Sequence, residues 1–220
     1  MDPFWSVLMP LGYTFCHQLP ERSYILGDLQ MPVCARCIGI HVGFLLSSIV
    51  MWTGARRFSS GMWGRNSLYV LVTSVLAGFA LAALSYAGIG FSDNTSRTLS
   101  GLLIGTPIPF IVLPVLGMIA FPGRNKRASI ADRRDWLLLL AAFGAGAALI
   151  FPATGSLPLF YAASIAGVIG LGVFLFTMVT IAVMVLTDGK NLRFRSRLAI
   201  SAVSGIAVFI LLAIGHFVMI

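Results

Sequence analysis

Residues 157–186 read LPLFYAASIAGVIGLGVFLFTMVTIAVMVL, thirty residues without an Asp, Glu, Lys or Arg. A helix needs about 20 apolar residues to cross the hydrocarbon core of a bilayer, so this stretch predicts a transmembrane helix. The composition of the whole chain agrees, because 58% of its 220 residues are hydrophobic and only 10% are charged. An average soluble domain carries roughly 25% charged residues, and the apolar excess here must therefore face lipid.

Other apolar runs of spanning length lie between the charged loops. They cover approximately residues 38–54, 67–89, 98–121, 136–152 and 198–220. Residues 4–15 are apolar and aromatic but too short to span, which favours an interfacial or re-entrant helix. We therefore expect one all-α membrane domain with about six transmembrane helices, in which residues 1–37 form a cysteine-containing segment and residues 38–220 form the bundle.

The basic residues predict the orientation of the bundle. Three of them follow the first span, five follow the third and four follow the fifth, which together are twelve of the fifteen Lys and Arg residues. The positive-inside rule places these loops in the cytoplasm, so both termini and the cysteine segment are expected on the extracytoplasmic side of the cell membrane. The net charge of +8 is accounted for by these loops, and we expect the bilayer, not nucleic acid, as the partner.

All three cysteines lie within 22 residues, as Cys16 followed by the Cys34-Ala-Arg-Cys37 pair. His17 follows Cys16 directly, and His41 lies one helical turn after Cys37. A CxxC pair brings two sulfurs within reach of one metal ion, and a third cysteine with a histidine completes a tetrahedral Cys3His set. This pattern predicts a metal site of Cys16, His17, Cys34 and Cys37, with zinc or iron as the ion and His41 as the alternative fourth ligand.

Two other interpretations of the cysteines stay open. Cys34 and Cys37 suit a thiol–disulfide oxidoreductase with Cys16 as the exchanging thiol, since extracytoplasmic compartments favour disulfides. The third interpretation is a static disulfide that pins the N-terminal segment and leaves one thiol spare. Cys37 is expected in the first turn of a helix, where the helix dipole and Arg36 would favour a thiolate.

Polar residues of the same predicted surface are candidates for catalysis or for binding an anion. Arg22 and Arg36 lie in the cysteine segment, and Arg97 lies in the loop between the second and third spans. Membrane insertion needs few positive charges on the outer face, so these arginines are candidates for binding a carboxylate, a thiolate or another anion. The catalytic candidates are Arg22, Arg36, Arg97, Glu21 and Asn94.

The stretch Phe15-Cys-His-Gln-Leu-Pro-Glu-Arg-Ser23, followed by Pro32-Val-Cys-Ala-Arg-Cys-Ile-Gly39, resembles an uncharacterised prokaryotic membrane-protein family, domain-of-unknown-function family 2085. A second stretch, Asn94-Thr-Ser-Arg-Thr-Leu-Ser-Gly101, resembles another block of that family. The resemblance implies a membrane protein but no activity. It also implies that Asn94 and Arg97 pack near the cysteines, because topology brings both blocks to one face.

The spans themselves limit the function. None has an Asp, Glu, Lys or Arg near its middle, which counts against an ion-coupled transporter. Pro107, Pro109 and Pro114 must break or kink the third span, so a transporter or channel remains a third hypothesis. Small residues offer faces for helix packing or for a homodimer, namely Gly144, Gly146, Gly167, Gly170 and Gly172.

The leading hypothesis is an integral membrane protein with an extracytoplasmic zinc–thiolate site. Such a site suits a metal-dependent enzyme acting on a lipid or another membrane-associated substrate. Whether the protein is an enzyme is left open by the sequence.

Overall fold

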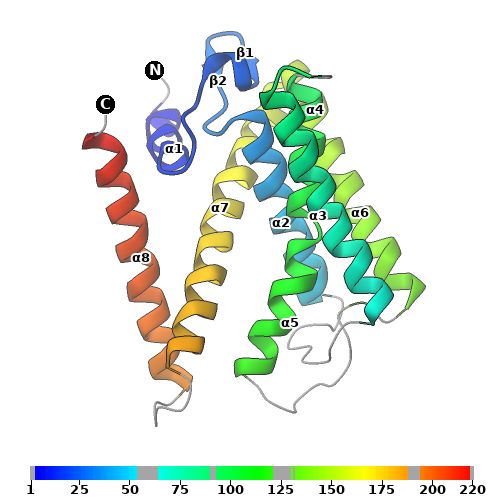
Figure 1. The fold of residues 1–220 in the computed structure, drawn as a ribbon. Helices are drawn as coiled ribbons and strands as arrows, with labels where there is room; N and C mark the ends of the chain where they lie inside the picture. Colours follow the sequence, from blue (N-terminus) through cyan, green and yellow to red (C-terminus); the bar gives the residue numbers. More distant parts are fainter. Residues whose placement is uncertain are drawn as a thin grey trace.

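The computed structural model describes residues 3–53, 64–89, 93–120, 130, 132–187 and 194–218. These residues form an all-α bundle with one two-stranded hairpin (Figure 1). The α-helices are α1 (Pro3–Tyr13), α2 (Ala35–Thr53), α3 (Arg65–Tyr86), α4 (Asn94–Gly105), α5 (Ile108–Ala120), α6 (Arg133–Ile150), α7 (Leu157–Leu186) and α8 (Phe194–Val218). The strands are β1 (Ile25–Leu26) and β2 (Leu29–Gln30), and short 3₁₀ turns cover Pro20–Arg22 and Phe151–Gly155.

Five helical stretches are long and apolar enough to cross a membrane by length and composition. They are Ala35–Thr53, Arg65–Tyr86, Asn94–Ile119, Arg133–Gly155 and Leu157–Leu186. They match the first five spans expected from the sequence, so the predicted fold class is confirmed. The sixth expected span corresponds to α8, of which Ser196–Leu211 forms a shorter apolar helix and residues 212–220 lie outside the described side chains.

The third span is broken at Thr106 and Pro107, which separate α4 from α5. Proline lacks the N–H that would continue the helix ladder, as the sequence predicted for this span. Pro114 lies inside α5. The break divides the span into α4, which contacts the cysteine-containing segment, and α5, which lies in the opposite half of the bundle.

Helix α2 lies at the centre of the bundle, flanked by α4, α6 and α7. It approaches α4 closely because glycines face each other across the contact. A Cβ atom added to Gly39 would lie 2.4 Å from the carbonyl oxygen of Thr98, and one added to Gly101 would lie 2.2 Å from that of Arg36. Gly105 has the same relation to Ile40, at 2.1 Å. Such small-residue contacts let backbones pack together where apolar burial offers no drive, as in a bilayer.

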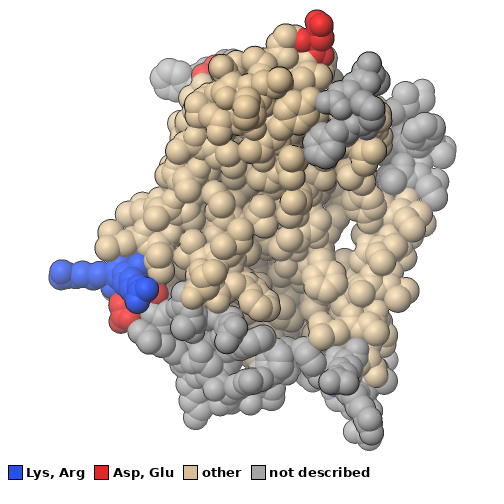
Figure 2. All heavy atoms as spheres, turned by 180° about the vertical axis from the view of Figure 1, so that it is seen from behind, with Lys and Arg blue, Asp and Glu red and all other residues tan. Residues whose placement is uncertain are grey.

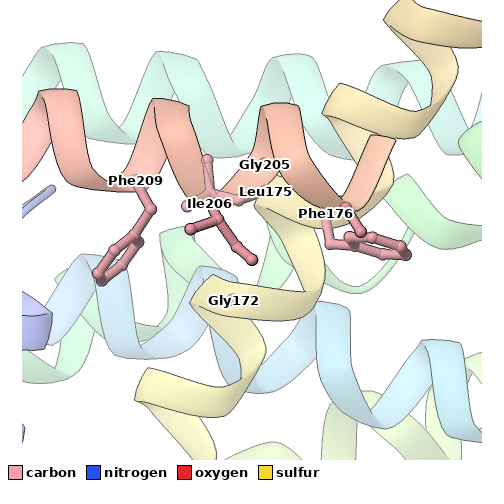
Figure 3. Close-up of a pocket in the computed structure, with 7 residues that line it drawn as sticks. Gly172, Leu175, Phe176, Gly205, Ile206 and Phe209 are labelled. Carbon is pink, nitrogen blue, oxygen red and sulfur yellow. The ribbon is translucent and has the colours of Figure 1, made fainter. Parts of the chain in front are cut away.

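Helix α8 contacts α7 and, near the chain ends, α1. Between α7 and α8 lies an open groove of about 390 Å³ (Figure 3). Its lining is apolar and comprises Gly172, Leu175, Phe176, Ala202, Gly205, Ile206 and Phe209. A groove of this composition on the rim of a bundle is compatible with contact to lipid chains.

The described surface is apolar over most of its height. Helix α3 is the clearest case, since Leu76, Phe79 and Leu84 are largely exposed on it. Figure 2 shows one face on which the charged described residues lie towards the two ends, with an uncharged belt between them. This distribution is the one expected of a bundle embedded in a bilayer.

Both chain ends lie at the same end of the bundle as α1, β1 and β2 (Figure 1). We call this the cysteine end, and it comprises α1, residues 14–34, the first turns of α2 and α4, and the last turn of α3. Helix α1 is seen nearly end-on in Figure 1, whereas the long helices run from the top to the bottom of the picture. It is anchored by Trp5, whose ring stacks on Phe160 and meets the edge of Tyr161 on α7.

Candidate metal centre

The segment between α1 and α2 is folded by the side-chain amide of Gln18. Its Nε2 donates to the carbonyl oxygens of Met9 at 2.8 Å and of Pro32 at 2.6 Å. Gln18 is buried and takes a positive φ of 49°, which turns the chain sharply after Cys16. One residue thus ties α1 to the stretch that leads into α2.

The hairpin then reverses the chain so that residues 31–34 return towards Cys16. Ile25 pairs with Gln30 and Leu26 with Leu29, and Gly27 at the turn has a φ of 59°. The indole N–H of Trp5 donates to the Gln30 carbonyl at 3.1 Å, which joins the hairpin to α1. The fully buried side chains of Met31 and Val33 pack residues 31–34 against the bundle.

The sulfurs of Cys16, Cys34 and Cys37 lie within 4.8 Å of one another. All three are free thiols; Cys16 is buried, and the other two are half-buried. Tetrahedral zinc with Zn–S bonds of about 2.3 Å separates its sulfurs by about 3.8 Å. The three sulfurs therefore need to move together by only a fraction of their spacing to hold such an ion.

The backbone around the cysteines favours thiolates. The N–H of Cys34 donates to the Cys16 sulfur at 3.1 Å, and the Cys34 carbonyl accepts the N–H of Ile38 at 2.9 Å, so Cys34 sits at the N-cap of α2. Hydrogen bonds from Cys16 and Cys37, with further ones from the N–H groups of Cys37 and Arg36, lower the pKa of the Cys34 thiol. Because Cys16 donates to Cys34, its own pKa is raised. The first thiolate of the cluster therefore forms on Cys34.

The two histidines differ in position. His17 is exposed and is not part of the group of ligand atoms that lie within 4.8 Å of one another, so its role as a ligand stays a prediction. His41 is buried in α2, and its Nδ1 has no hydrogen-bond partner among the described residues. Its ring lies against Phe174 of α7, with 6.0 Å between the ring centroids.

Arg36 turns away from the cysteines that flank it in sequence. Its Nε donates to the Ser100 hydroxyl at 3.4 Å, and its Nη2 donates to the Ala82 carbonyl at 3.5 Å. The expectation that its charge favours a thiolate on Cys37 stays a prediction. What Arg36 gives the cluster is its backbone N–H, which bonds to the Cys34 sulfur.

The second sequence block packs against the cysteine segment, as the resemblance implied. Asn94 donates to the Ser23 carbonyl at 2.9 Å, and Arg97 donates to the Glu21 carbonyl at 3.2 Å and to the Asn94 side chain at 3.0 Å. Of the catalytic candidates, Glu21 contributes this backbone carbonyl, while its side chain is exposed.

Sequence reasoning missed the two hydroxyls that connect this block to α2. The Tyr24 hydroxyl lies 2.8 Å from that of Thr98, which in turn donates to the Ala35 carbonyl at 3.0 Å. Burial raises the pKa of Tyr24, so the phenol stays protonated and donates to the Asn94 carbonyl. Thr98 is fully buried. The sequence signal that could have identified Tyr24 was its position directly after the Phe15–Ser23 block.

Comparisons with known proteins cover this same part of the chain. A family model described as a predicted membrane protein, DUF2085, matches residues 16–111. An uncharacterized protein of Methanocaldococcus jannaschii is 26% identical over 116 residues, which are 51% of this chain and 72% of that protein. No solved structure gives a significant match. The resemblance noted from the sequence is confirmed over the matched residues, which include every cysteine.

Proposed function

Starting from the family match over residues 16–111, we propose that this multi-pass membrane protein binds one thiolate-preferring metal ion, zinc, through Cys16, Cys34 and Cys37. The observation that carries the proposal is the convergence of three free thiols within 4.8 Å. A disulfide needs only two sulfurs, so it would not account for the presence of the third cysteine in the cluster. Three sulfurs are the number that a thiolate-rich zinc site with one further ligand requires.

The surroundings of the sulfurs support the same proposal. The N–H of Cys34 on the Cys16 sulfur is the kind of hydrogen bond that stabilises a coordinating thiolate. The Gln18 amide and the hairpin hold residues 16 and 34 together, although 18 positions separate them in sequence. The site is therefore organised by the fold before any ion binds.

The fourth coordination position decides what the ion does. With His17 or His41 as the fourth ligand, the ion would only fasten the cysteine segment to the bundle. With that position open, zinc supplies Lewis-acid chemistry: it polarises a phosphate or carbonyl oxygen or activates water. We propose the open form, and hence an enzyme acting on a lipid or another membrane-associated substrate, since Cys34 and Cys37 are half-buried.

The orientation of the site is part of the proposal. The positive-inside rule puts the cysteine end on the extracytoplasmic side. Of the cytoplasmic basic residues that it uses, Arg65, Arg133, Arg134 and Arg197 are described with their side chains, and the others lie outside that part of the structure. Arg133 and Arg134 open α6, at the end of the bundle opposite the cysteines.

A second candidate function is thiol–disulfide exchange, favoured by the position of Cys34 at the N-cap of α2 with a lowered pKa. The Cys34 thiolate would attack a substrate disulfide, and Cys37 would then displace the reduced substrate and leave a Cys34–Cys37 disulfide. Transport has less support, because the groove beside α5 is lined by aliphatic residues of α3 and α5.

Metal analysis of the purified full-length protein tests the proposal. We expect about one zinc per chain, and thiols that react with a labelling reagent only after a chelator is added. Cys16→Ser, Cys34→Ser and Cys37→Ser should each lose the ion, while Ser47→Ala, a buried hydroxyl deeper in α2, should keep it. A metal-free protein in which two thiols react only after reduction would overturn the proposal in favour of redox exchange or a static disulfide.

A further inference from the structure

Two arginines from different parts of the cysteine end meet on one aromatic ring. The guanidinium carbon of Arg22 lies 5.0 Å from the centroid of the Tyr86 ring, and that of Arg36 lies 5.2 Å from the same centroid. Arg22 ends the 3₁₀ turn Pro20–Arg22, Arg36 is in the first turn of α2, and Tyr86 is the last residue of α3. The fold thus brings two positive charges together that the metal site does not use.

These two charges are not neutralised by the contacts that the structure gives them. Arg36 contacts a hydroxyl, a carbonyl and a ring, and Arg22 contacts the same ring. In the described part of the chain none of these partners is a carboxylate. The side chains of Glu21 and Asp28 are exposed, and Asp93 caps α4 by accepting from the N–H of Ser96 at 3.2 Å. The nearby acids therefore face solvent or hold the backbone.

The arginines also retain unused hydrogen-bond donors. A guanidinium carries five N–H groups in a planar fork, and the two bonds of Arg36 use only one on Nε and one on Nη2. A third arginine, Arg97, is held nearby through the Glu21 carbonyl, next to Arg22 in sequence. Forked donors of this kind match the oxygens of a phosphate group.

The depth of the cluster fits a membrane phosphate. Tyr86 ends an apolar helix of 22 residues, and Arg36 begins the neighbouring span, so the cluster lies where a bilayer has its headgroups. Tyr86 is 69% exposed, which leaves the cluster open to the membrane surface. Arginine snorkelling alone would carry the charges outward to water, whereas Arg36 reaches sideways to α3 and α4.

From this geometry we propose that Arg22, Arg36 and Tyr86 form a binding site for the phosphate group of an anionic ligand, separate from the cysteine cluster. The phosphate lies against both guanidinium groups, and Tyr86 fixes them in place. The ligand is either the headgroup of an anionic lipid or a free phosphate compound. The site goes beyond the proposed metal function and does not depend on it.

The test measures lipid binding by the full-length protein. Protein in detergent is mixed with phosphatidylglycerol or phosphatidylcholine, and the bound lipid is counted by native mass spectrometry, with and without inorganic phosphate. The variants are Arg22→Gln, Arg36→Lys and the double variant Arg22→Gln/Arg36→Gln. Arg134→Gln, an exposed arginine at the opposite end of the bundle, is the matched control. Zinc content is measured on the same samples, which reports on folding and on the metal site independently.

We expect the wild type to bind phosphatidylglycerol in preference to phosphatidylcholine. Arg22→Gln should weaken this binding about fivefold and the double variant more than tenfold, since each arginine contributes to the attraction of an anionic headgroup. Arg134→Gln should have no effect. Arg36→Lys keeps the charge but loses the fork, so partial loss would identify the fork itself as the recognition element.

The phosphate arm identifies the source of the ligand. Weak competition by inorganic phosphate indicates a lipid headgroup, whereas tight binding of phosphate without lipid indicates a soluble compound. Equal phosphatidylglycerol and phosphate binding by wild type and double variant, with zinc content unchanged, would overturn the proposal and leave the proposed metal function intact.

Discussion

Gln18 organises the cysteine end through a single amide group. Its side-chain Nε2 donates to the backbone carbonyls of Met9 and Pro32, and its backbone carbonyl accepts from the side-chain amide of Gln30. The residue was visible in the sequence as part of the Cys-His-Gln block, but its task depends on segments 9 to 14 positions away. Its neighbour His17 points outward.

Replacement of Gln18 by alanine should loosen the metal site without touching a sulfur. The carbonyls of Met9 and Pro32 would lose their donor, and for the buried bond to Pro32 an unsatisfied polar group costs about 1–3 kcal/mol. We expect the Gln18→Ala protein to release zinc at least tenfold faster to a chelator, as followed with a colorimetric zinc indicator. Leu19→Ala, at an exposed neighbouring side chain, is the control. Equal release rates in the two variants would contradict this role of Gln18.

The cysteines should differ in reactivity once the ion is removed. The pKa of Cys34 is lowered and that of Cys16 is raised, so the Cys34 thiolate persists as pH falls below the ordinary thiol value while Cys16 is protonated. We expect alkylation of the chelator-treated protein at pH 6 to 7 to label Cys34 first, as mapped by peptide mass spectrometry. Labelling of all three cysteines with one common midpoint near pH 9 would contradict the assignment.

The lowered pKa of Cys34 also determines in which direction the stability of the metal-free fold changes with pH. A thiol whose pKa is lowered in the folded state adds stability that is complete above its unfolded pKa and is lost as pH falls towards the folded pKa. For Cys34 this contribution therefore decreases from about pH 9 downwards. The raised pKa of Cys16 acts in the opposite direction, because its stabilisation is present below the ordinary pKa and is lost at high pH.

Among the helices, the contact between α2 and α4 connects the bundle to the cysteine end. Gly39 and Gly43 of α2 face the α4 side, and Gly101 and Gly105 of α4 face α2. The glycines predicted from the sequence to offer packing faces lie in the fourth and fifth spans and do not include these four. The Gly-x-x-x-Gly spacing of both pairs was the signal that could have identified them.

A larger residue at this contact should separate the two helices. In Gly101→Val the new Cβ would meet the Arg36 carbonyl at 2.2 Å, and overpacking of this kind costs about 1–3 kcal/mol. We expect a clearly lower melting temperature in detergent and loss of zinc, because Cys37 lies in the first turn of α2 and Cys34 caps that helix. Gly144→Val on α6, where nothing lies within 4 Å of an added Cβ, is the matched control. Equal melting temperatures for the two variants would contradict the close contact.

For the whole molecule, the position of both chain ends at the cysteine end requires an even number of crossings (Figure 1). Five helical stretches meet the length and hydropathy of a span, and we expect α8, whose described part Ser196–Leu211 is a shorter apolar helix, to supply the sixth crossing. The orientation stays a prediction of the positive-inside rule, by which the basic loops are expected in the cytoplasm.

Reporter fusions test this topology. A fluorescent protein should be bright, and alkaline phosphatase inactive, when inserted in the basic stretch between α5 and α6. The reverse is expected for fusion at the C-terminus, because that end shares the side of the cysteines. Moving the basic residues of the stretch to the other side is expected to disturb insertion. A C-terminus that scores as cytoplasmic would contradict this topology: the sixth crossing if the loop between α5 and α6 is also cytoplasmic, and the extracytoplasmic position of the cysteines if that loop is not.

The sequence by itself determined the membrane bundle, the approximate spans and the segment that carries the thiols. Hydropathy and charge act locally along the chain, so a span or a basic loop can be recognised without knowledge of its neighbours. The break at Pro107 could also be predicted from the local sequence, because a proline interrupts the hydrogen bonds of the helix in which it lies.

Only the tertiary structure decided which side chains meet. The convergence of Cys16 with Cys34 and Cys37 depends on Gln18 and on the hairpin. The turn of Arg36 towards Tyr86 depends on the rotation of α2 against α3 and α4. Contacts between residues far apart in sequence, such as Glu21 and Arg97 at a separation of 76 positions, are set by helix packing. Helix packing depends on how the side chains of different helices fit together in three dimensions, and local patterns along the sequence do not reveal that fit.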